Sequence, residues 1–211
     1  MIEVLSYISN SSVQLLVRNN IIQEKESPIY RYGFELFWST FLCVMSIIAI
    51  GEITGNLNKA ICFLLYFMPI RTFAGGYHAK SYRNCFLLTN FLNAFSIVLS
   101  SVLVEYVVVK IIGLCLGFFS LFYIWENSPV VFKAHPIKKE VARKNRHYTH
   151  RLILLELPIF IFQYIRTYQV FYTAAITICI VAVMMFISIN KEEKKHEFNI
   201  DGSGNVYSKS C

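Results

Sequence analysis

Apolar segments, all but one without charged residues, alternate with short polar segments along most of this chain. The apolar segments are residues 36–51, 60–70, 86–104, 111–125, 152–165 and 170–190. About 20 apolar residues in a helix cross a bilayer, whereas ten to fourteen do not. The pattern predicts an all-α, polytopic membrane protein with about six transmembrane or half-membrane segments. It leaves open whether residues 60–70 span the membrane or form a re-entrant segment.

The two ends of the chain follow a different pattern. Apolar residues between Ile2 and Ile21 recur at roughly helical spacing among Asn, Ser, Gln and Glu. Residues 1–30 are therefore predicted to form an amphipathic helix, which either lies on the membrane or packs on a neighbouring element. Residues 31–190 are predicted to form the membrane-embedded domain, and residues 191–211 a polar, partly disordered cytoplasmic tail.

Composition supports the membrane class. Of the 211 residues, 55% are hydrophobic and 16% are charged, whereas soluble domains contain about 25% charged residues. A soluble helical bundle would not carry its apolar residues in such long uncharged runs. The six cysteines include no CxxC pair, so neither a disulfide framework nor a cysteine metal site is expected.

The basic residues cluster in alternate polar segments. Residues 71–84 carry a net charge of +3 and residues 126–151 carry +5, whereas 52–59 and 105–110 are neutral. Because basic loops stay in the cytoplasm, both termini and residues 71–84 and 126–151 are predicted to be cytoplasmic in a multi-pass cell-membrane protein. The overall charge of +7 then reflects topology, and no nucleic-acid partner is expected.

A histidine and a cysteine share the polar segment that precedes residues 86–104. An imidazole can take the proton of a nearby thiol, and the resulting thiolate attacks carbonyl carbon. His78 and Cys85 are seven residues apart, roughly 10 Å along a helix, so a direct contact would need a bend between them. The spacing alone is equally consistent with a histidine and a cysteine that share this segment by chance.

Neighbouring residues fit a peptidase site, although each has a simpler explanation. Gly75 and Gly76 let the backbone bend and approach a peptide closely, or form an ordinary turn. Arg71 and Lys80 favour a thiolate nearby, or serve only as topogenic charges.

These residues resemble the accessory gene regulator B (AgrB) family of Gram-positive bacteria. The resemblance rests on Arg71, on the Gly75-Gly76-Tyr-His78-Ala core and on Cys85 seven residues after the histidine. It extends to the amphipathic start, to Glu35 before the first apolar segment, to the basic segment with its two prolines and to the apolar C-terminal hairpin. Nothing is carried over beyond residue 191.

The resemblance implies a membrane cysteine endopeptidase of a quorum-sensing system. Such a protein cuts the C-terminal part from an AgrD-type propeptide and helps to close a cyclic thiolactone or lactone. Cys85 would be the nucleophile that carries the acyl-enzyme, and His78 the general base. The partners implied are the propeptide and membrane lipid. Whether the protein forms a homodimer is left open, as are the ring size and the exporter of the product.

Several other residues carry alternative interpretations. Glu35 either orients His78, as a third residue orients the base of a triad, or is an interfacial carboxylate. Arg71 could instead bind an acidic propeptide tail. Glu156, inside an apolar segment, is either functional or paired with a neighbour such as Arg151.

A metal site and a transporter are the remaining alternatives. The candidate metal ligands are His135, His147 and His150, but the surrounding basic residues repel a cation, so no metal or cofactor is expected. A small membrane transporter or peptide exporter without hydrolytic chemistry would show repeat symmetry and paired polar residues at the midplane. Neither feature is evident in the sequence.

Overall fold

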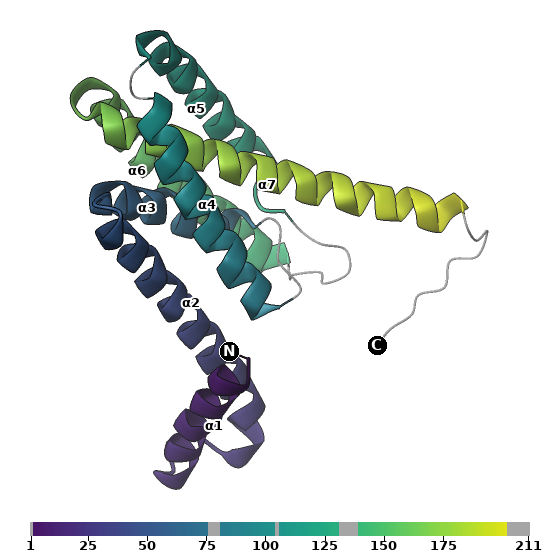
Figure 1. Cartoon of the computed structure of the whole chain (residues 1–211). Coiled ribbons are helices and arrows are strands. Elements are labelled where there is room, and N and C mark those ends of the chain that lie inside the picture. Colours follow the sequence, from purple (N-terminus) through teal and green to yellow (C-terminus); the bar gives the residue numbers. More distant parts are fainter. Residues whose placement is uncertain (1, 76–80, 104–105, 131–138, 202–211) are drawn as a thin grey trace. The chain divides into compact units, whose positions relative to one another are not determined.

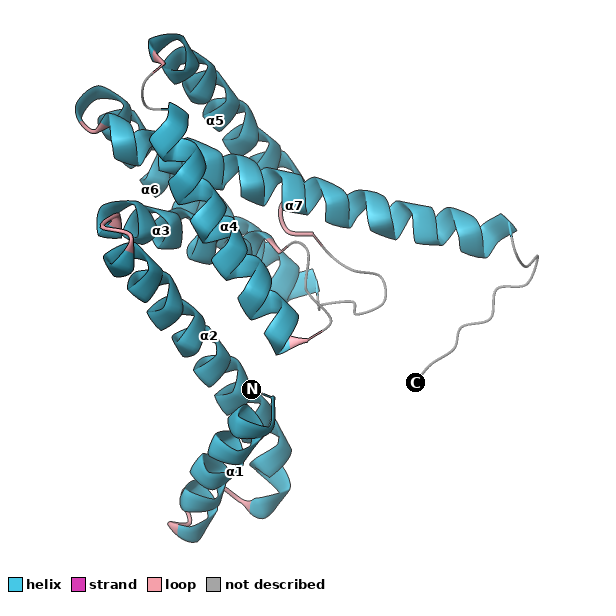
Figure 2. Cartoon of the chain, viewed as in Figure 1, coloured by secondary structure: helices cyan, strands magenta, loops and turns pink. Residues whose placement is uncertain are grey.

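Helices and short turns make up all of the described part of the chain (Figures 1 and 2). The computed structural model describes residues 2–75, 81–103, 106–130 and 139–201. Its elements are α1 (Ile2–Arg18), the 3₁₀ turn η1 (Glu24–Glu26), α2 (Ser27–Ile53), α3 (Leu57–Ala74), α4 (Tyr82–Leu103), α5 (Val107–Asn127), α6 (Lys139–Arg166) and α7 (Tyr168–Asp201). The all-α prediction is confirmed.

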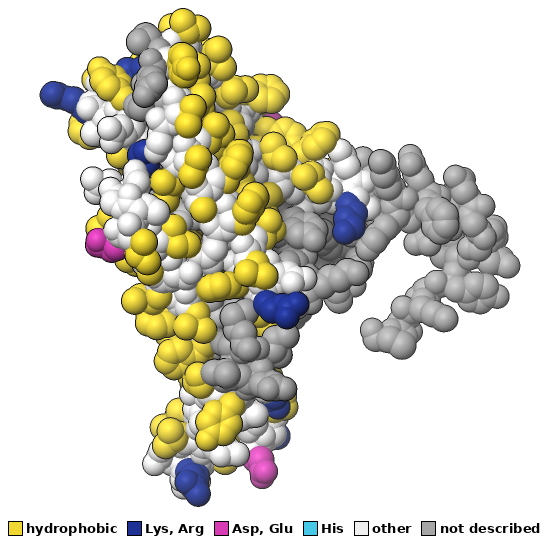
Figure 3. Space-filling model, in the orientation of Figure 1, with side chains coloured by type: hydrophobic (Ala, Val, Ile, Leu, Met, Phe, Trp, Pro, Cys, Tyr) yellow, Lys and Arg dark blue, Asp and Glu magenta, His cyan; other side chains and the backbone are white. Residues whose placement is uncertain are grey.

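Four described helical stretches are long and apolar enough to cross a membrane. They are Glu24–Ile53, Tyr82–Leu103, Val108–Asn127 and Tyr168–Lys191. Large apolar side chains such as Phe41, Phe91 and Phe119 are exposed on them, and apolar side chains spread over the face seen in Figure 3. Soluble proteins rarely expose so much apolar surface, so the chain is a polytopic membrane protein. The predicted segments 60–70 and 152–165 lie in α3 and α6, outside these four stretches.

The described residues divide into two compact units. The first unit contains residues 2–64 and 81–99, and the second contains residues 65–75, 100–103, 106–130 and 139–201. The division falls inside α3 and near the end of α4.

In the first unit, α1 packs along α2. Val13 of α1 is buried, as is Ile22 in the connection that follows. The predicted helix over residues 1–30 ends earlier, at Arg18, because the next turn contains Asn20 in the left-handed region (φ 54°), which asparagine tolerates. The following helix starts at Ser27, with Pro28 in its first turn, where the missing N–H of proline costs nothing.

The turn between α2 and α3 is a Schellman motif. The N–H of Asn56 donates to the carbonyl of Gly51 (2.8 Å), and the N–H of Gly55 donates to that of Glu52 (3.0 Å). Gly55 takes the left-handed conformation that this motif requires (φ 64°). A turn therefore lies within the predicted polar segment 52–59, but it is shorter than predicted, because α2 ends at Ile53 and α3 begins at Leu57.

One face of α4 carries buried polar side chains. Thr89, Asn93 and Ser96 recur at spacings of four and three residues, and all three are almost completely buried. Beside this stripe, Asn90 accepts a hydrogen bond of 2.8 Å from Ser46 of α2 within the first unit. The opposite side of α4 exposes large apolar side chains, namely Leu87, Phe91, Phe95 and Val98.

The second unit is built around α5, α6 and α7. Helices α5 and α6 run antiparallel, because Lys110 lies over the ring of Tyr164 at one end and Trp125 stacks on His150 at the other. Between these contacts, Gly117 of α5 leaves room for the ring of Phe160. Helix α6 continues through Pro158 and also includes residues 139–151 of the predicted basic loop.

Helix α7 extends beyond the apolar segment that predicted it. The apolar run ends at Asn190, but the helix continues to Asp201. The sequence Lys-Glu-Glu-Lys-Lys after Asn190 consists of strong helix formers, which explains the continuation. The predicted polar tail therefore begins as a helix.

Candidate functional site

Cys85 lies in the first turn of α4, at the start of a membrane-spanning stretch. Ser81 caps this helix: its hydroxyl accepts the N–H of Asn84 (3.3 Å) and its carbonyl accepts the N–H of Cys85 (3.0 Å). The thiol is of intermediate burial. The cap fixes the orientation of the first turn.

The proposed general base and one glycine of the motif fall in a gap of the structure. His78 and Gly76 lie outside the described residues, as does Lys80. The His78–Cys85 pairing and the roles assigned to these residues stay predictions.

Arg71 and Gly75 lie at the end of α3, in the second unit. The guanidinium of Arg71 lies 5.2 Å from the centre of the Phe67 ring, a cation–π contact. Gly75 follows the helix with φ 76°, and a Cβ atom there would lie 3.0 Å from the carbonyl oxygen of Val130. The neighbouring Ala74 carbonyl accepts the N–H of Val130 at 2.8 Å. In this structure the glycine permits a close approach between two backbone segments of the protein itself.

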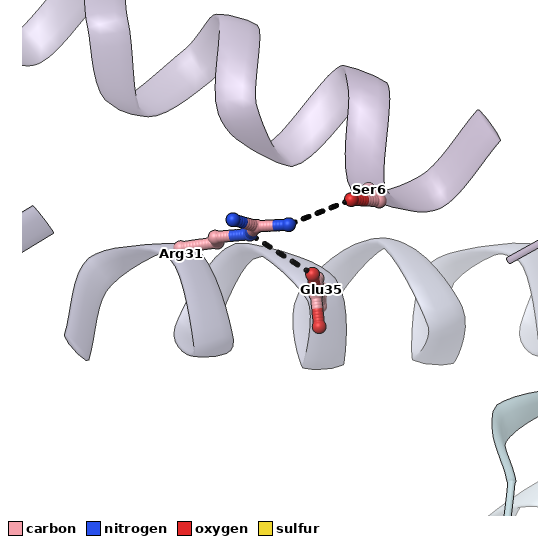
Figure 4. A network of polar contacts seen from close by, with 3 residues as sticks. All are labelled: Ser6, Arg31 and Glu35. Atoms are coloured by element: carbon pink, nitrogen blue, oxygen red, sulfur yellow. Dashed lines mark hydrogen bonds and ion pairs between the residues drawn. The ribbon is translucent and has the colours of Figure 1, made fainter. Parts of the chain in front are cut away.

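Glu35 lies inside α2, two turns after its start, instead of at a helix entrance. Its carboxylate is 3.4 Å from Nε of Arg31, whose Nη2 donates to the hydroxyl of Ser6 at 2.9 Å (Figure 4). The pair therefore joins α1 to α2. Of the candidate residues that the structure describes, the first unit contains Glu35 and Cys85.

A cleft of about 790 Å³ separates α1 from η1 and the start of α2. It was not predicted from the sequence, although two amide side chains one turn apart on an amphipathic helix were visible there. Its lining residues are Asn10, Val13, Gln14, Val17, Arg18, Glu24, Ser27, Pro28, Arg31, Tyr32 and Glu35.

Glu156 lies on the buried face of α6, between Ile153 and Phe160. The predicted pairing with Arg151 is wrong: among the described residues, neither carboxyl oxygen of Glu156 has a hydrogen-bond partner. The two residues are five positions apart and point to different sides of the helix, Arg151 being exposed.

The histidines of the basic segment have other contacts. The ring of His150 stacks on Trp125, with centroids 3.8 Å apart, and its Nε2 lies 3.1 Å from the Trp125 carbonyl oxygen. His147 is exposed on α6, and His135 lies outside the described residues. Within the described ranges, no three His, Cys, Asp or Glu side chains gather as a metal site would require.

Comparison with known proteins finds relatives of one kind. The chain is 26% identical over 150 residues to AgrB-like protein 1 of Clostridium perfringens strain 13, a match covering 64% of this chain and 72% of the relative. It is 28% identical over 141 residues to an AgrB-like protein of C. perfringens strain SM101 and 27% identical over 141 residues to AgrB-like protein 2 of strain 13. Each of these two matches covers 65% of both chains, so the chain aligns with just under two thirds of their length.

No solved structure matches the chain. The family model for accessory gene regulator B, in contrast, matches residues 9–190, which include every predicted site residue from Glu35 to Cys85. The chain therefore belongs to the accessory gene regulator B family.

Proposed function

We propose that this protein is a membrane cysteine endopeptidase that cuts the C-terminal part from an AgrD-type propeptide and assists its cyclisation. The observation that carries the proposal is the family match over residues 9–190, which encloses the His78-to-Cys85 motif. The position of Cys85 supports it, because a thiol beside the capped first turn of α4 can meet a peptide at the membrane boundary.

In the proposed first step, His78 takes the proton of the Cys85 thiol and the sulfur attacks the carbonyl carbon of the scissile bond. The C–N bond then breaks, and His78 returns the proton to the departing amine. The N-terminal part of the propeptide remains as a thioester on Cys85. Ser81 already accepts the N–H groups of Asn84 and Cys85, so the N–H groups of Tyr82 and Arg83 in the same first turn are the candidates to stabilise the oxyanion.

In the second step, a thiol or hydroxyl of the bound peptide attacks the thioester. A new thioester or ester bond closes the ring, the bond to Cys85 breaks, and the attacking group's proton passes through His78 back to the Cys85 sulfur. Exchange of one thioester for another is nearly balanced in energy, so the outcome depends on excluding water until the ring has closed.

Arg71 and Glu35 are proposed to support this reaction. Arg71 would hold the acidic tail of the propeptide by paired hydrogen bonds to a carboxylate. Glu35 would orient His78. Following the distribution of basic residues, this chemistry is proposed to occur on the cytoplasmic side, with both termini in the cytoplasm.

The test is propeptide cleavage in cells. The protein is co-expressed with the propeptide of the neighbouring gene, and propeptide mass is followed for the unmodified protein, Cys85→Ala and His78→Ala. Both variants should lose processing while inserting normally. Cys115→Ala is the matched control, because it removes an exposed thiol from α5 and should process normally.

A covalent peptide adduct on Cys85 would identify the nucleophile directly. If Cys85→Ala still cleaves the propeptide, the peptidase assignment fails. A transporter without hydrolytic chemistry would tolerate Cys85→Ser and export an unprocessed peptide.

A further inference from the structure

We propose that the cleft between α1 and α2 binds an extended, uncharged segment of the substrate peptide. The inference rests on the proposed peptidase function and adds a substrate-binding site that lies outside the motif. The cleft belongs entirely to the first unit and, at about 790 Å³, is of the size that proteins use for ligands.

The amide side chains of α1 fit a peptide main chain. Asn10 and Gln14 both line the cleft, and in the described part of the chain neither has a hydrogen-bond partner. They are one helical turn apart, about 6 Å along the axis. Alternate residues of an extended peptide are about 6.6 Å apart and present one N–H and one C=O each. Each amide offers a matching acceptor and donor.

The floor of the cleft favours side chains that are at least partly apolar. Val13 and Val17 of α1 face Pro28 and Tyr32 of the second helix across it. An extended peptide places alternate side chains on opposite sides, so one row would contact this floor.

The charges of the lining balance. Arg18 and Arg31 face the cleft together with Glu24 and Glu35, and Arg31 is already held by Glu35. A lining without net charge gives no advantage to an anionic or cationic ligand, and it matches a peptide segment without charged residues. A phosphate-bearing lipid headgroup would meet two carboxylates in the same space.

The cleft and Cys85 belong to the same compact unit, with the cleft formed by α1, η1 and the start of α2 and the cysteine in α4.

The experiment uses the full-length protein in lipid nanodiscs and the synthetic propeptide of the neighbouring gene. Asn10→Leu and Gln14→Leu remove the amides but keep side-chain size. Each should raise the KM for cleavage about three- to tenfold, because it removes one or two hydrogen bonds to the peptide. The kcat should stay unchanged. Ser11→Leu adds the same side chain to the exposed part of α1 outside the cleft and should change KM less than twofold.

Binding to the Cys85→Ala protein separates this inference from the proposed function. Fluorescent propeptide should bind to this variant, and adding Gln14→Leu should raise the Kd by the same factor as the KM for cleavage. If the amide variants change neither KM nor Kd while cleavage proceeds, the cleft assignment is overturned and the peptidase remains. If the peptide binds through the amides but is never cleaved, the peptidase proposal fails and the cleft stands. Loss of anionic lipid binding alone would make the cleft a lipid site and also overturn the inference.

Discussion

The backbone N–H of Val130 donates a 2.8 Å hydrogen bond to the carbonyl oxygen of Ala74. This contact ties the end of α3 to the segment that follows α5. It lies directly before Gly75, the first glycine of the motif, and depends on the absence of a side chain there.

Gly75→Ala should therefore damage both stability and processing. The new methyl group would lie 3.0 Å from the Val130 oxygen, and alanine disfavours φ 76° by about 1–2 kcal/mol. We expect a lower free energy of unfolding in detergent and reduced propeptide cleavage. Gly55→Ala is the control, because Gly55 has a similar φ of 64° with open space around it. If the two substitutions reduce processing equally, the Val130 contact is unimportant.

Gly117→Ala should destabilise the second unit by about 1–3 kcal/mol, because the added methyl group would overlap the ring of Phe160. Gly113→Ala meets only ordinary contacts with Phe171 and should stabilise α5 by up to about 1 kcal/mol through helix propensity. Thermal unfolding of the purified protein in detergent measures both effects. Combining Gly117→Ala with Phe160→Leu should recover part of the loss, and a purely additive result would contradict the overlap.

Lys110→Met should lower the free energy of unfolding by about 1 kcal/mol. The Lys110 ammonium lies 4.3 Å from the centre of the Tyr164 ring and 3.8 Å from that of Tyr168, so the substitution removes two cation–π contacts but keeps the length of the side chain. Lys110→Arg should retain most of the stability. If Lys110→Met and Lys110→Arg lower the free energy of unfolding equally, the cation–π contacts with the two rings do not contribute to stability.

Glu156→Gln should change stability by less than about 1 kcal/mol, because the described residues provide no partner for its carboxyl group to lose. Gln163→Leu, on the same buried face of α6, should cost about 1–3 kcal/mol, since it breaks the buried hydrogen bond from Tyr66 (3.2 Å). Unfolding of the two variants is compared under one condition. A larger loss for Glu156→Gln than for Gln163→Leu would reveal a carboxylate interaction.

The sequence predicted the features that depend on local pattern. Long apolar runs identified the spanning helices, and Gly55 with Asn56 marked the α2–α3 turn, because a left-handed residue is required there. Helix ends within charged sequence were harder to locate. Residues 139–151 and the start of the tail lack an apolar stripe, although their side chains favour a helix.

The packing of one helix against another could not be predicted from the pattern of apolar and polar residues. The cleft exists because α1 turns back along α2, and no periodicity in residues 1–30 specifies that angle. The Glu35–Arg31 pair needed only helical spacing of four residues and could have been predicted once α2 was known to start at Ser27. The Arg151–Glu156 pairing failed because five positions along a helix separate two side chains by more than a quarter turn.

The polar stripe on α4 restricts how this helix can sit in a bilayer. Thr89, Asn93 and Ser96 share one side, while Phe91 and Phe95 occupy the other. Rotation about the helix axis by a single residue step would expose hydroxyl and amide groups to hydrocarbon, where an unpaired polar group is costly. The two unlike faces of α4 therefore favour one rotational setting of the helix, and with it one orientation of the first turn that contains Cys85.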